Sequence, residues 1–223
     1  MGNEKFSFTE ENYLKSIYKF HVFSEEKITN VTIAGILNVN PASALEMIRR
    51  MAKKQLLSYD KKMGIHLTSR GKKIAINTIR KHRLWEVFLA EKLGFSWDEI
   101  HEIAEQLEHV QSYTLTERLD KFLGFPDVDP HGDPIPRLTG KTLRPQGFPL
   151  SSIKKNKNVI LVGVTDHQDS FLKYLNKIGI GLGVKIQIHS VESYDNSLSI
   201  SIHERKRFTI SEKVAAQLLV REM

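Results

Sequence analysis

The sequence contains no cysteine among its 223 residues. Disulfide bonds, thiolate metal sites and cysteine nucleophiles are therefore excluded. It also lacks an apolar run approaching twenty residues and a signal-peptide pattern at its start, so we expect a cytoplasmic protein with no membrane partner. The length suffices for one large domain or for two to three small domains, each with its own core.

Acidic residues are scarce in the first part of the chain. Residues 1–80 hold 14 Lys or Arg and only 7 Asp or Glu, whereas the remaining residues hold 19 of each class. The whole excess of +7 lies in the N-terminal third, which favours docking of that part on a polyanion. Proline is scarce too, and six of the seven prolines fall within 126–149, which predicts an extended connection there and no folded element.

The first part has the pattern of a winged helix-turn-helix. We expect a first helix over 9–22 with Thr9 as its N-cap, a short helix over 30–38 and a second over 41–54. Two short strands, 56–59 and 64–68, would form a β-hairpin wing with a basic tip. Helix, tight turn and helix place the second helix in the DNA major groove.

The helix expected over 41–54 has an apolar and a polar side. Its core residues would be Ala44, Met47, Ile48 and Met51. The candidate DNA-binding residues lie on its outer side and at the wing tip: Ala42, Ser43, Glu46, Arg49, Arg50, Lys53, Lys61 and Lys62. Winged helices also serve as protein-interaction modules, but the confinement of the positive excess to this part favours DNA binding.

A second group of residues offers metal ligands. The amphipathic helix expected over 98–110 carries four on one face, His101, Glu105, Glu108 and His109. The long helix expected over 72–91 places His82 and Glu86 four residues apart. Oxygen and imidazole ligands without thiolate suit Mn(II) or Fe(II), although Zn(II) and Co(II) accept the same types. The alternative is two ordinary solvated helix faces, but two such helices close together favour a metal site.

The last part of the chain, from residue 151, alternates short strands with helices. Strands are expected over 159–164, 185–189, 198–202 and 207–210, a helix over 170–178, and a closing helix over 211–220 with Ser211 as its cap. A helix over 117–125, ahead of the proline-rich segment, would pack a dimer through Leu115, Leu119, Phe122 and Leu123.

The order of these motifs resembles the DtxR/MntR family of metal-dependent transcriptional repressors. After the winged helix come three motifs that carry the resemblance: His82-Arg-Leu-x-Glu86, His101-x-x-x-Glu105-x-x-Glu108-His109 and Gly-Asp-Pro-Ile-Pro at 132–136. The resemblance covers essentially the whole chain. It implies a homodimer that binds a palindromic operator in double-stranded DNA when Mn(II) or Fe(II) is bound. It also implies a C-terminal SH3-like domain of the FeoA type.

Carried over by position, the resemblance implies two metal sites. The primary site would use Glu105, Glu108 and His109, with Asn12 or Glu11 from the first helix; the family usually has Asp or Met where Asn12 stands. Glu105 stands where the iron-responsive branch has Cys, so the chain resembles the manganese-responsive branch.

The ancillary site would use His82, Glu86 and His101, with Asp166 or Gln168 from a loop of the third domain. In short manganese-responsive members the equivalent of His82 joins the main cluster instead.

We therefore predict a mainly α protein with small β parts: a winged helix-turn-helix domain at 1–75, a helical metal-binding and dimerisation domain at 76–140 and an SH3-like β-barrel domain at 151–223. The predicted function is a Mn(II)-activated repressor of metal-ion homeostasis genes, without enzymatic activity. The alternatives are an Fe(II)-dependent repressor, a metallohydrolase and a metal-independent DNA-architectural protein. The sequence offers no separate nucleophile or glycine-rich substrate loop for hydrolysis.

Overall fold

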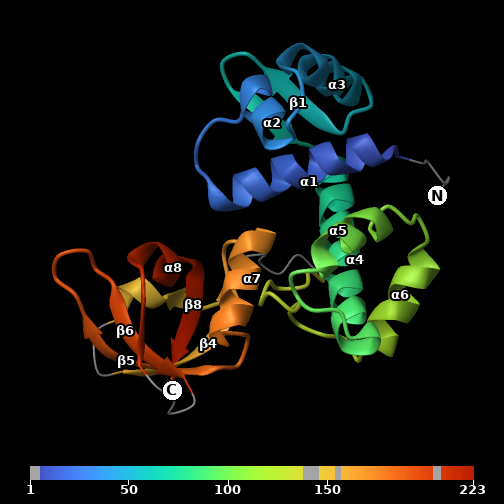
Figure 1. Ribbon diagram of the computed structural model, residues 1–223. Helices are drawn as coiled ribbons and strands as arrows, with labels where there is room; N and C mark the ends of the chain where they lie inside the picture. The colour runs from blue at the N-terminus through green and yellow to red at the C-terminus, as the bar shows by residue number, and fades with distance from the viewer. Residues whose placement is uncertain (1–5, 138–145, 154–156, 203–206) are drawn as a thin grey trace. The chain divides into compact units, whose positions relative to one another are not determined.

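The structure is a computed structural model that describes residues 6–137, 146–153, 157–202 and 207–223. Its chain divides into two compact units. The first unit comprises Met1–Trp85, Ala104–Phe125 and Ile135–Arg144, and the second comprises Glu86–Ile103, Pro126–Pro134 and Pro145–Met223. Figure 1 traces the elements in chain order. The long helix α4 (Ser69–Leu93) contributes residues to both units.

Helix α1 (Phe8–Phe23) begins earlier than the sequence pattern predicts, because its N-cap is Ser7 and not Thr9. The Ser7 hydroxyl accepts a hydrogen bond from Glu10 N at 3.2 Å, and the Glu10 carboxylate accepts one from Ser7 N at 3.1 Å. This reciprocal capping box satisfies two backbone donors that a helix start leaves open. The helix buries Tyr13, Leu14 and Ile17, as its apolar spacing predicts.

The winged helix-turn-helix is confirmed. Helices α2 (Asn30–Ile36) and α3 (Pro41–Lys53) are followed by an antiparallel hairpin of β1 (Leu57–Asp60) and β2 (Gly64–Leu67), and all four elements gather on one side of α1 (Figure 1). Pro41 occupies the first turn of α3, where its missing N–H costs nothing. Ala44, Ile48 and Met51 of α3 are fully buried in this core, and Met47 packs against it.

The helices expected over 98–110 and 117–125 differ from their predicted bounds. Helix α5 (Ile100–Leu107) ends before Glu108, so the last two candidate ligands occupy the turn after it. Val110, the last residue of the helix expected over 98–110, is 40 % exposed because the chain has already left the helix. Helix α6 (Tyr113–Phe122) begins four residues before the predicted 117, because the Ser112 hydroxyl caps it by accepting from Leu115 N.

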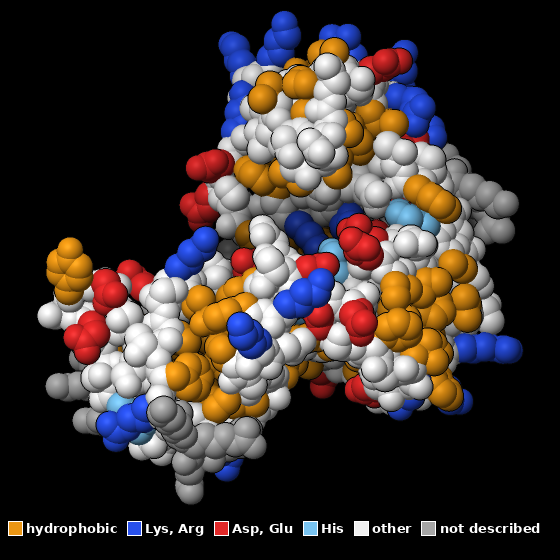
Figure 2. All heavy atoms as spheres, viewed as in Figure 1, with side chains coloured by type: hydrophobic (Ala, Val, Ile, Leu, Met, Phe, Trp, Pro, Cys, Tyr) orange, Lys and Arg blue, Asp and Glu red, His pale blue; other side chains and the backbone are white. Residues whose placement is uncertain are grey.

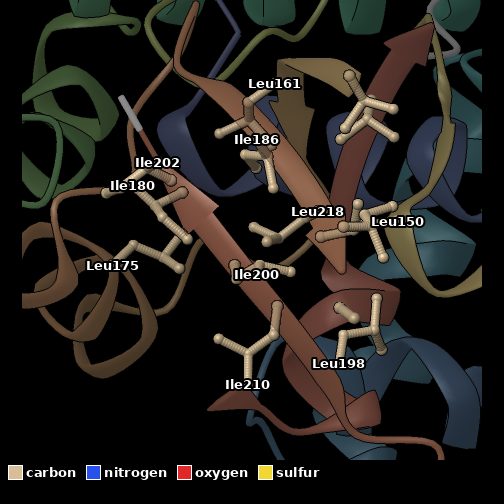
Figure 3. Packing of buried hydrophobic residues seen from close by; sticks show 14 of the residues in the cluster. Leu150, Leu161, Leu175, Ile180, Ile186, Leu198, Ile200, Ile202, Ile210 and Leu218 are labelled. Carbon is tan, nitrogen blue, oxygen red and sulfur yellow. The ribbon is translucent and has the colours of Figure 1, made fainter. Parts of the chain in front are cut away.

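The second unit contains a six-stranded antiparallel sheet in the order β3-β8-β4-β5-β6-β7. The strands are β3 (Phe148–Pro149), β4 (Asn158–Val164), β5 (Lys185–Val191), β6 (Leu198–Ile202), β7 (Phe208–Ile210) and β8 (Leu218–Glu222). A 3-10 helix (Leu150–Ser152) and the helices α7 (Asp169–Ile178) and α8 (Glu212–Gln217) accompany the sheet. Leu150, Leu175 of α7 and strand residues such as Ile186 and Leu218 pack in one core (Figure 3).

Two predictions for the C-terminal half are wrong. Ser211 caps α8 as expected, but the helix ends at Gln217 and the next residues form β8, which pairs with β4 in the sheet. Leu218 and Val220 are buried, so the apolar run that resembles a helix end is a strand covered on both faces. The segment 126–134 is also more than a connection, since an isolated bridge joins Val128 to Pro134.

Across the described segments, no individual helix has both the length and the apolar character of a membrane span; α2 and α3 meet that criterion only jointly, as a pair bent by 110°.

Candidate metal centre and nucleic-acid interface

The first unit brings four predicted ligands into one buried cluster. His109 Nδ1 lies 2.6 Å from Glu11 Oε2, and His82 Nδ1 lies 2.7 Å from Glu108 Oε2. Glu108 is completely buried, and the other three are at most 7 % exposed. These residues come from α1, from α4 and from the turn after α5, so the cluster joins three helical segments. Buried carboxylates and imidazoles require partners, and here Glu11 and His109 share a hydrogen bond while Glu108 and His82 are in close contact.

Two lysines balance the carboxylates of this cluster. Lys15 Nζ lies 2.6 Å from Glu108 Oε1 and 3.3 Å from Glu105 Oε1, and Lys81 Nζ lies 3.4 Å from Glu11 Oε1. Burial by itself raises the pKa of the Glu108 carboxyl, but the contact with His82 and the charge of Lys15 outweigh it, so the pKa lies below its usual value. Glu108 is therefore a carboxylate at neutral pH.

The imidazole of His109 is held in a fixed orientation. Its Nδ1 donates to the Glu11 carboxylate, and the ring of Phe8 stacks on it with centroids 4.5 Å apart. Gln111 Nε2 donates to Phe6 O at 2.6 Å, which ties the chain ahead of α1 to the ligand turn. The remaining nitrogen, Nε2, lies 3.8 Å from Glu108 Oε1. A carboxylate on one ring nitrogen is the arrangement that orients a histidine ligand for a metal on the other.

Asn12 supplies the observation that tests whether a cation fits this cluster. Its Oδ1 is buried and has no hydrogen-bond partner in the part of the chain that the structure describes. A buried oxygen without a donor is costly unless a cation or a water satisfies it. Glu105, whose side chain is 52 % exposed, lies at the rim of the cluster. The carboxylates of Glu105 and Glu108, the imidazole of His109 and the amide oxygen of Asn12 are ligand types that a divalent cation preferring oxygen ligands accepts.

The second unit contains a second cluster, around Glu86. His101 Nδ1 lies 3.3 Å and His131 Nδ1 3.7 Å from Glu86 Oε1, and Asp129 Oδ1 is 4.0 Å from His131 Nδ1. Ligand atoms of Glu86, Asp129 and His131 all lie within 4.8 Å of one another. Burial lowers the pKa of His131, but the two neighbouring carboxylates outweigh it and raise the pKa to about 9. A site that holds a proton between two buried carboxylates also suits a cation.

Asp129 and His131 are ligand candidates that the sequence analysis missed. Both lie in the proline-rich segment, directly before the Gly-Asp-Pro-Ile-Pro motif, and the run Asp-Pro-His is the signal that could have found them. Hydrogen bonds within the loop and to Trp97 fix the Asp129 and His131 side chains. Asp129 Oδ1 accepts from the backbone N of His131 at 2.8 Å and of Asp133 at 3.0 Å, while His131 Nε2 donates to Trp97 O at 2.9 Å.

Strand β4 fixes this loop in place. Val164 N donates to His131 O at 3.0 Å, next to the bulge between Leu161 and Gly163. Gly132, at φ +86°, lies so close to β4 that a Cβ would be 2.1 Å from Val162 O. Only glycine combines this backbone angle with this approach. The six-stranded sheet therefore positions two of the candidate ligands through β4.

The structure does not bring Asp166 or Gln168 to this cluster among its described contacts. Asp166 Oδ1 accepts from Gln168 N at 2.9 Å, and Gln168 is the exposed N-cap residue of α7. It is the residue between them, His167, whose ring packs against His131, with centroids 4.9 Å apart. Ligand atoms of His82, Glu86 and His101, the three helix residues of the predicted ancillary site, all lie within 4.8 Å of one another.

The expected DNA-binding residues are all exposed: Ala42, Ser43, Glu46, Arg49, Arg50 and Lys53 on α3, and Lys61 and Lys62 at the wing tip. Lys and Arg side chains surround this end of the first unit (Figure 2). An ion pair joins α3 to α1, because Lys54 Nζ, at the C-cap of α3, lies 2.7 Å from the buried carboxylate of Glu10. Glu10 directly precedes Glu11 of the buried cluster.

Comparisons with known proteins agree with this organisation. Residues 5–65 match the N-terminal DNA binding domain of iron dependent repressors, residues 68–137 match their metal binding and dimerisation domain, and residues 148–222 match the FeoA domain. The iron-dependent repressor IdeR of Mycobacterium tuberculosis is 35 % identical over 140 residues, which are 62 % of this chain and 60 % of IdeR. That alignment thus spans less than two thirds of IdeR.

Other relatives align over more of their length. The regulator MntR of Oceanobacillus iheyensis is 33 % identical over 115 residues, 52 % of this chain and 77 % of MntR. A solved manganese-dependent transcriptional repressor in complex with manganese is 30 % identical, with a TM-score of 0.82 over 96 % of this chain and 100 % of that one. ScaR with bound Zn²⁺ is 34 % identical, with a TM-score of 0.75 over 96 % of this chain and 99 % of ScaR.

These matches are to transcriptional repressors and not to hydrolases, which decides against the metallohydrolase alternative. The arrangement of winged helix, ligand-bearing helices and FeoA domain agrees with the order of motifs in the sequence. The chain belongs to the DtxR/MntR family of metal-dependent transcriptional repressors.

Proposed function

We propose that this chain is a cytoplasmic repressor that binds a palindromic operator as a homodimer when Mn(II) occupies its primary site, and that it controls genes of metal-ion homeostasis. The observation that carries the proposal is the buried cluster of Glu11, His82, Glu108 and His109, built onto the same helix α1 that supports the winged helix. In this proposal 1–75 binds DNA, 76–140 binds metal and forms the dimer, and 151–223 supports the second site.

The primary ligands that we propose are Glu105, Glu108, His109 through Nε2, and Asn12 through Oδ1. Glu11 would orient His109 and would not bind the metal itself, since its carboxylate is 2.6 Å from Nδ1 of that ring. The buried and unpartnered oxygen of Asn12 among the described residues supports its place in the set. His82, in contact with Glu108, would hold that carboxylate in position.

The donor types favour Mn(II). The set offers oxygen and one imidazole, without sulfur, and such ligands prefer a hard cation. Fe(II) is the alternative, and Zn(II) or Co(II) would compete in vitro by ligand type. Among the relatives, one solved structure is of a manganese-dependent repressor with manganese, whereas IdeR is described as iron-dependent.

The structure suggests how the chain would couple metal to DNA. When bound, the metal supplies two positive charges to the carboxylates of the cluster. Asn12 on α1 would thereby be held against Glu108 and His109 after α5. The neighbouring residue Glu10 forms an ion pair with Lys54 at the end of α3. A fixed position of α1 would therefore also fix the position of α3. Metal and DNA must then favour each other's binding by the same factor.

We propose Glu86, Asp129, His131 and His101 as the second metal site, supported by the short distances among Glu86, Asp129 and His131, by the contact of His101 with Glu86 and by the loop that β4 holds. For the dimer, we propose the exposed apolar residues of α6. Leu115 and Phe122 are 40 % and 64 % exposed, whereas Leu119 is 7 % exposed and packs within the unit.

The proposal is tested by DNA affinity with and without metal. Duplexes selected from a random library by the Mn(II)-loaded protein are titrated by fluorescence anisotropy, once with Mn(II) and once with a chelator. We expect Mn(II) to tighten binding by about tenfold or more. Glu108→Gln should lose this stimulation, while the matched control Glu222→Gln, an exposed carboxylate paired only with exposed Lys157 among the described contacts, should keep it. Equal affinity in Mn(II) and in chelator would identify a metal-independent DNA-binding protein instead.

A further inference from the structure

Lys15 is a buried cation inside the proposed primary site. It lies on α1, one turn after Glu11, and is 7 % exposed. Lysine is rarely buried to this degree without a strong partner. Its ammonium nitrogen is 2.6 Å from Glu108 Oε1 and 3.3 Å from Glu105 Oε1. One ammonium group therefore contacts both carboxylates that we assign to the metal.

The oxygen that Lys15 holds most closely is the one best placed as a ligand. Glu108 Oε1 is also the oxygen that lies 3.8 Å from His109 Nε2, the ring nitrogen left over when Nδ1 binds Glu11. A cation shared by Glu108 and His109 would have to contact this same oxygen. The second lysine of the cluster, Lys81, contacts only Glu11 among the described residues, at 3.4 Å.

We propose that Lys15 competes with the divalent cation for Glu105 and Glu108, so that its ammonium group sets the metal concentration at which the primary site fills. The inference rests on the proposed function and adds a residue that determines metal affinity. Without metal, Lys15 supplies the counter-charge that two adjacent carboxylates need. With metal, the ammonium group must leave the carboxylate oxygens, and that displacement weakens the apparent affinity for every divalent cation.

The competition predicts opposite effects on stability and on affinity. Lys15→Met removes the counter-charge, so the metal-free variant should unfold at lower temperature, because the buried Glu108 carboxylate loses its closest cation. The same change removes the competitor, so Mn(II) should bind more tightly and raise the melting temperature by more than in the wild type. A purely structural lysine would lower the stability of both states and leave the Mn(II) affinity unchanged.

Mn(II) binding is measured by electron paramagnetic resonance on the full chain. We expect Lys15→Met to lower the dissociation constant by at least about tenfold, since a close charge in a buried site is worth more than one decade of affinity. Lys15→Arg keeps the charge and should not tighten binding. Lys173→Met, which removes an exposed lysine of the second unit, is the control for net charge. An unchanged or weaker affinity in a folded Lys15→Met protein overturns the inference.

A measurement on the wild type covers the case in which Lys15→Met fails to fold. The protons of the buried ammonium group should exchange slowly with solvent, as observed by nuclear magnetic resonance. Adding diamagnetic Cd(II) should displace the group and make this exchange fast. Retained protection at saturating Cd(II) overturns the inference. The two proposals fail differently: if metal does not affect DNA binding, the proposed function is wrong. If metal stimulates DNA binding, but Lys15→Met does not tighten Mn(II) binding and the Lys15 ammonium group stays protected in Cd(II), only the competition is wrong.

Discussion

Replacing Asp120 by Asn should destabilise the first unit far more than replacing Glu117 by Gln, although both carboxylates bind one guanidinium group. Arg80 donates from Nη1 to Glu117 Oε1 at 2.6 Å and from Nη2 to Asp120 Oδ2 at 2.7 Å. The side chain of Glu117 is 39 % exposed, whereas that of Asp120 is 2 % exposed. The two ion pairs share the Arg80 guanidinium group and have similar distances, so burial is their main difference at Arg80.

The expected magnitudes follow from that difference. Removing one partner of a buried ion pair costs about 3–5 kcal/mol, because the other charge stays buried without compensation. An exposed pair contributes about 0–1 kcal/mol. Arg137 also donates to Asp120, at 3.0 Å, which adds to its role, but Glu117 would still neutralise Arg80. We therefore expect about 3 kcal/mol for Asp120→Asn and about 0.5 kcal/mol for Glu117→Gln.

Urea unfolding provides the assay. The chain has two tryptophans, Trp85 in the first unit and Trp97 in the second, so a Trp97→Phe background leaves fluorescence that reports the first unit alone. Asp120→Asn should lower the unfolding midpoint clearly and Glu117→Gln only slightly, with equal slopes. Similar losses for the two variants would refute the reasoning that burial decides the strength of these pairs.

Three further predictions concern DNA, the second metal site and pH. Arg49→Ala and Arg50→Ala should each weaken DNA binding and reduce the slope of log affinity against log salt by about 0.9 if the side chain neutralises one phosphate; an unchanged slope would place that arginine away from the backbone. Gly132→Ala should lower the Mn(II) stoichiometry from two to one in equilibrium dialysis, because a Cβ there would be 2.1 Å from a carbonyl oxygen of β4; two bound ions would contradict the assignment of the loop. Burial raises the pKa of Glu10, but Lys54 outweighs it and lowers the pKa below 4.5, so its contribution to stability is present above that pH and is lost as the pH falls through the folded value. Glu10→Gln should thus cost at most about 1 kcal/mol at neutral pH, since Lys54 is partly exposed. It should also reduce the fall in melting temperature as the pH is lowered below 4.5. A melting temperature that depends on pH as in the wild type would argue against the ion pair.

Local patterns predicted most of the helices and strands, and failures came where a local signal had two interpretations. Thr9 and Ser7 are both good caps, and only Ser7 has Glu10 at the spacing that closes a capping box. The run Leu218–Val220 satisfies a helix face as well as a strand buried on both sides. Short apolar runs do not distinguish these two states by periodicity. The pairing with β4 decides between them, and that pairing is a long-range contact.

The sequence alone determined the class of protein. The absence of cysteine, the basic N-terminal third, and the spacing of His82, Glu86, Glu105, Glu108 and His109 are properties of the chain itself, and they limit the ligands to oxygen and imidazole. The tertiary structure decided which of these groups meet. It brought Asp129 and His131 to Glu86, and it placed the Lys15 ammonium group against two carboxylates of the proposed primary site. Residue types follow from sequence, but charge neutralisation in a buried cluster depends on distances of a few ångströms between residues far apart in the chain, which only folding sets.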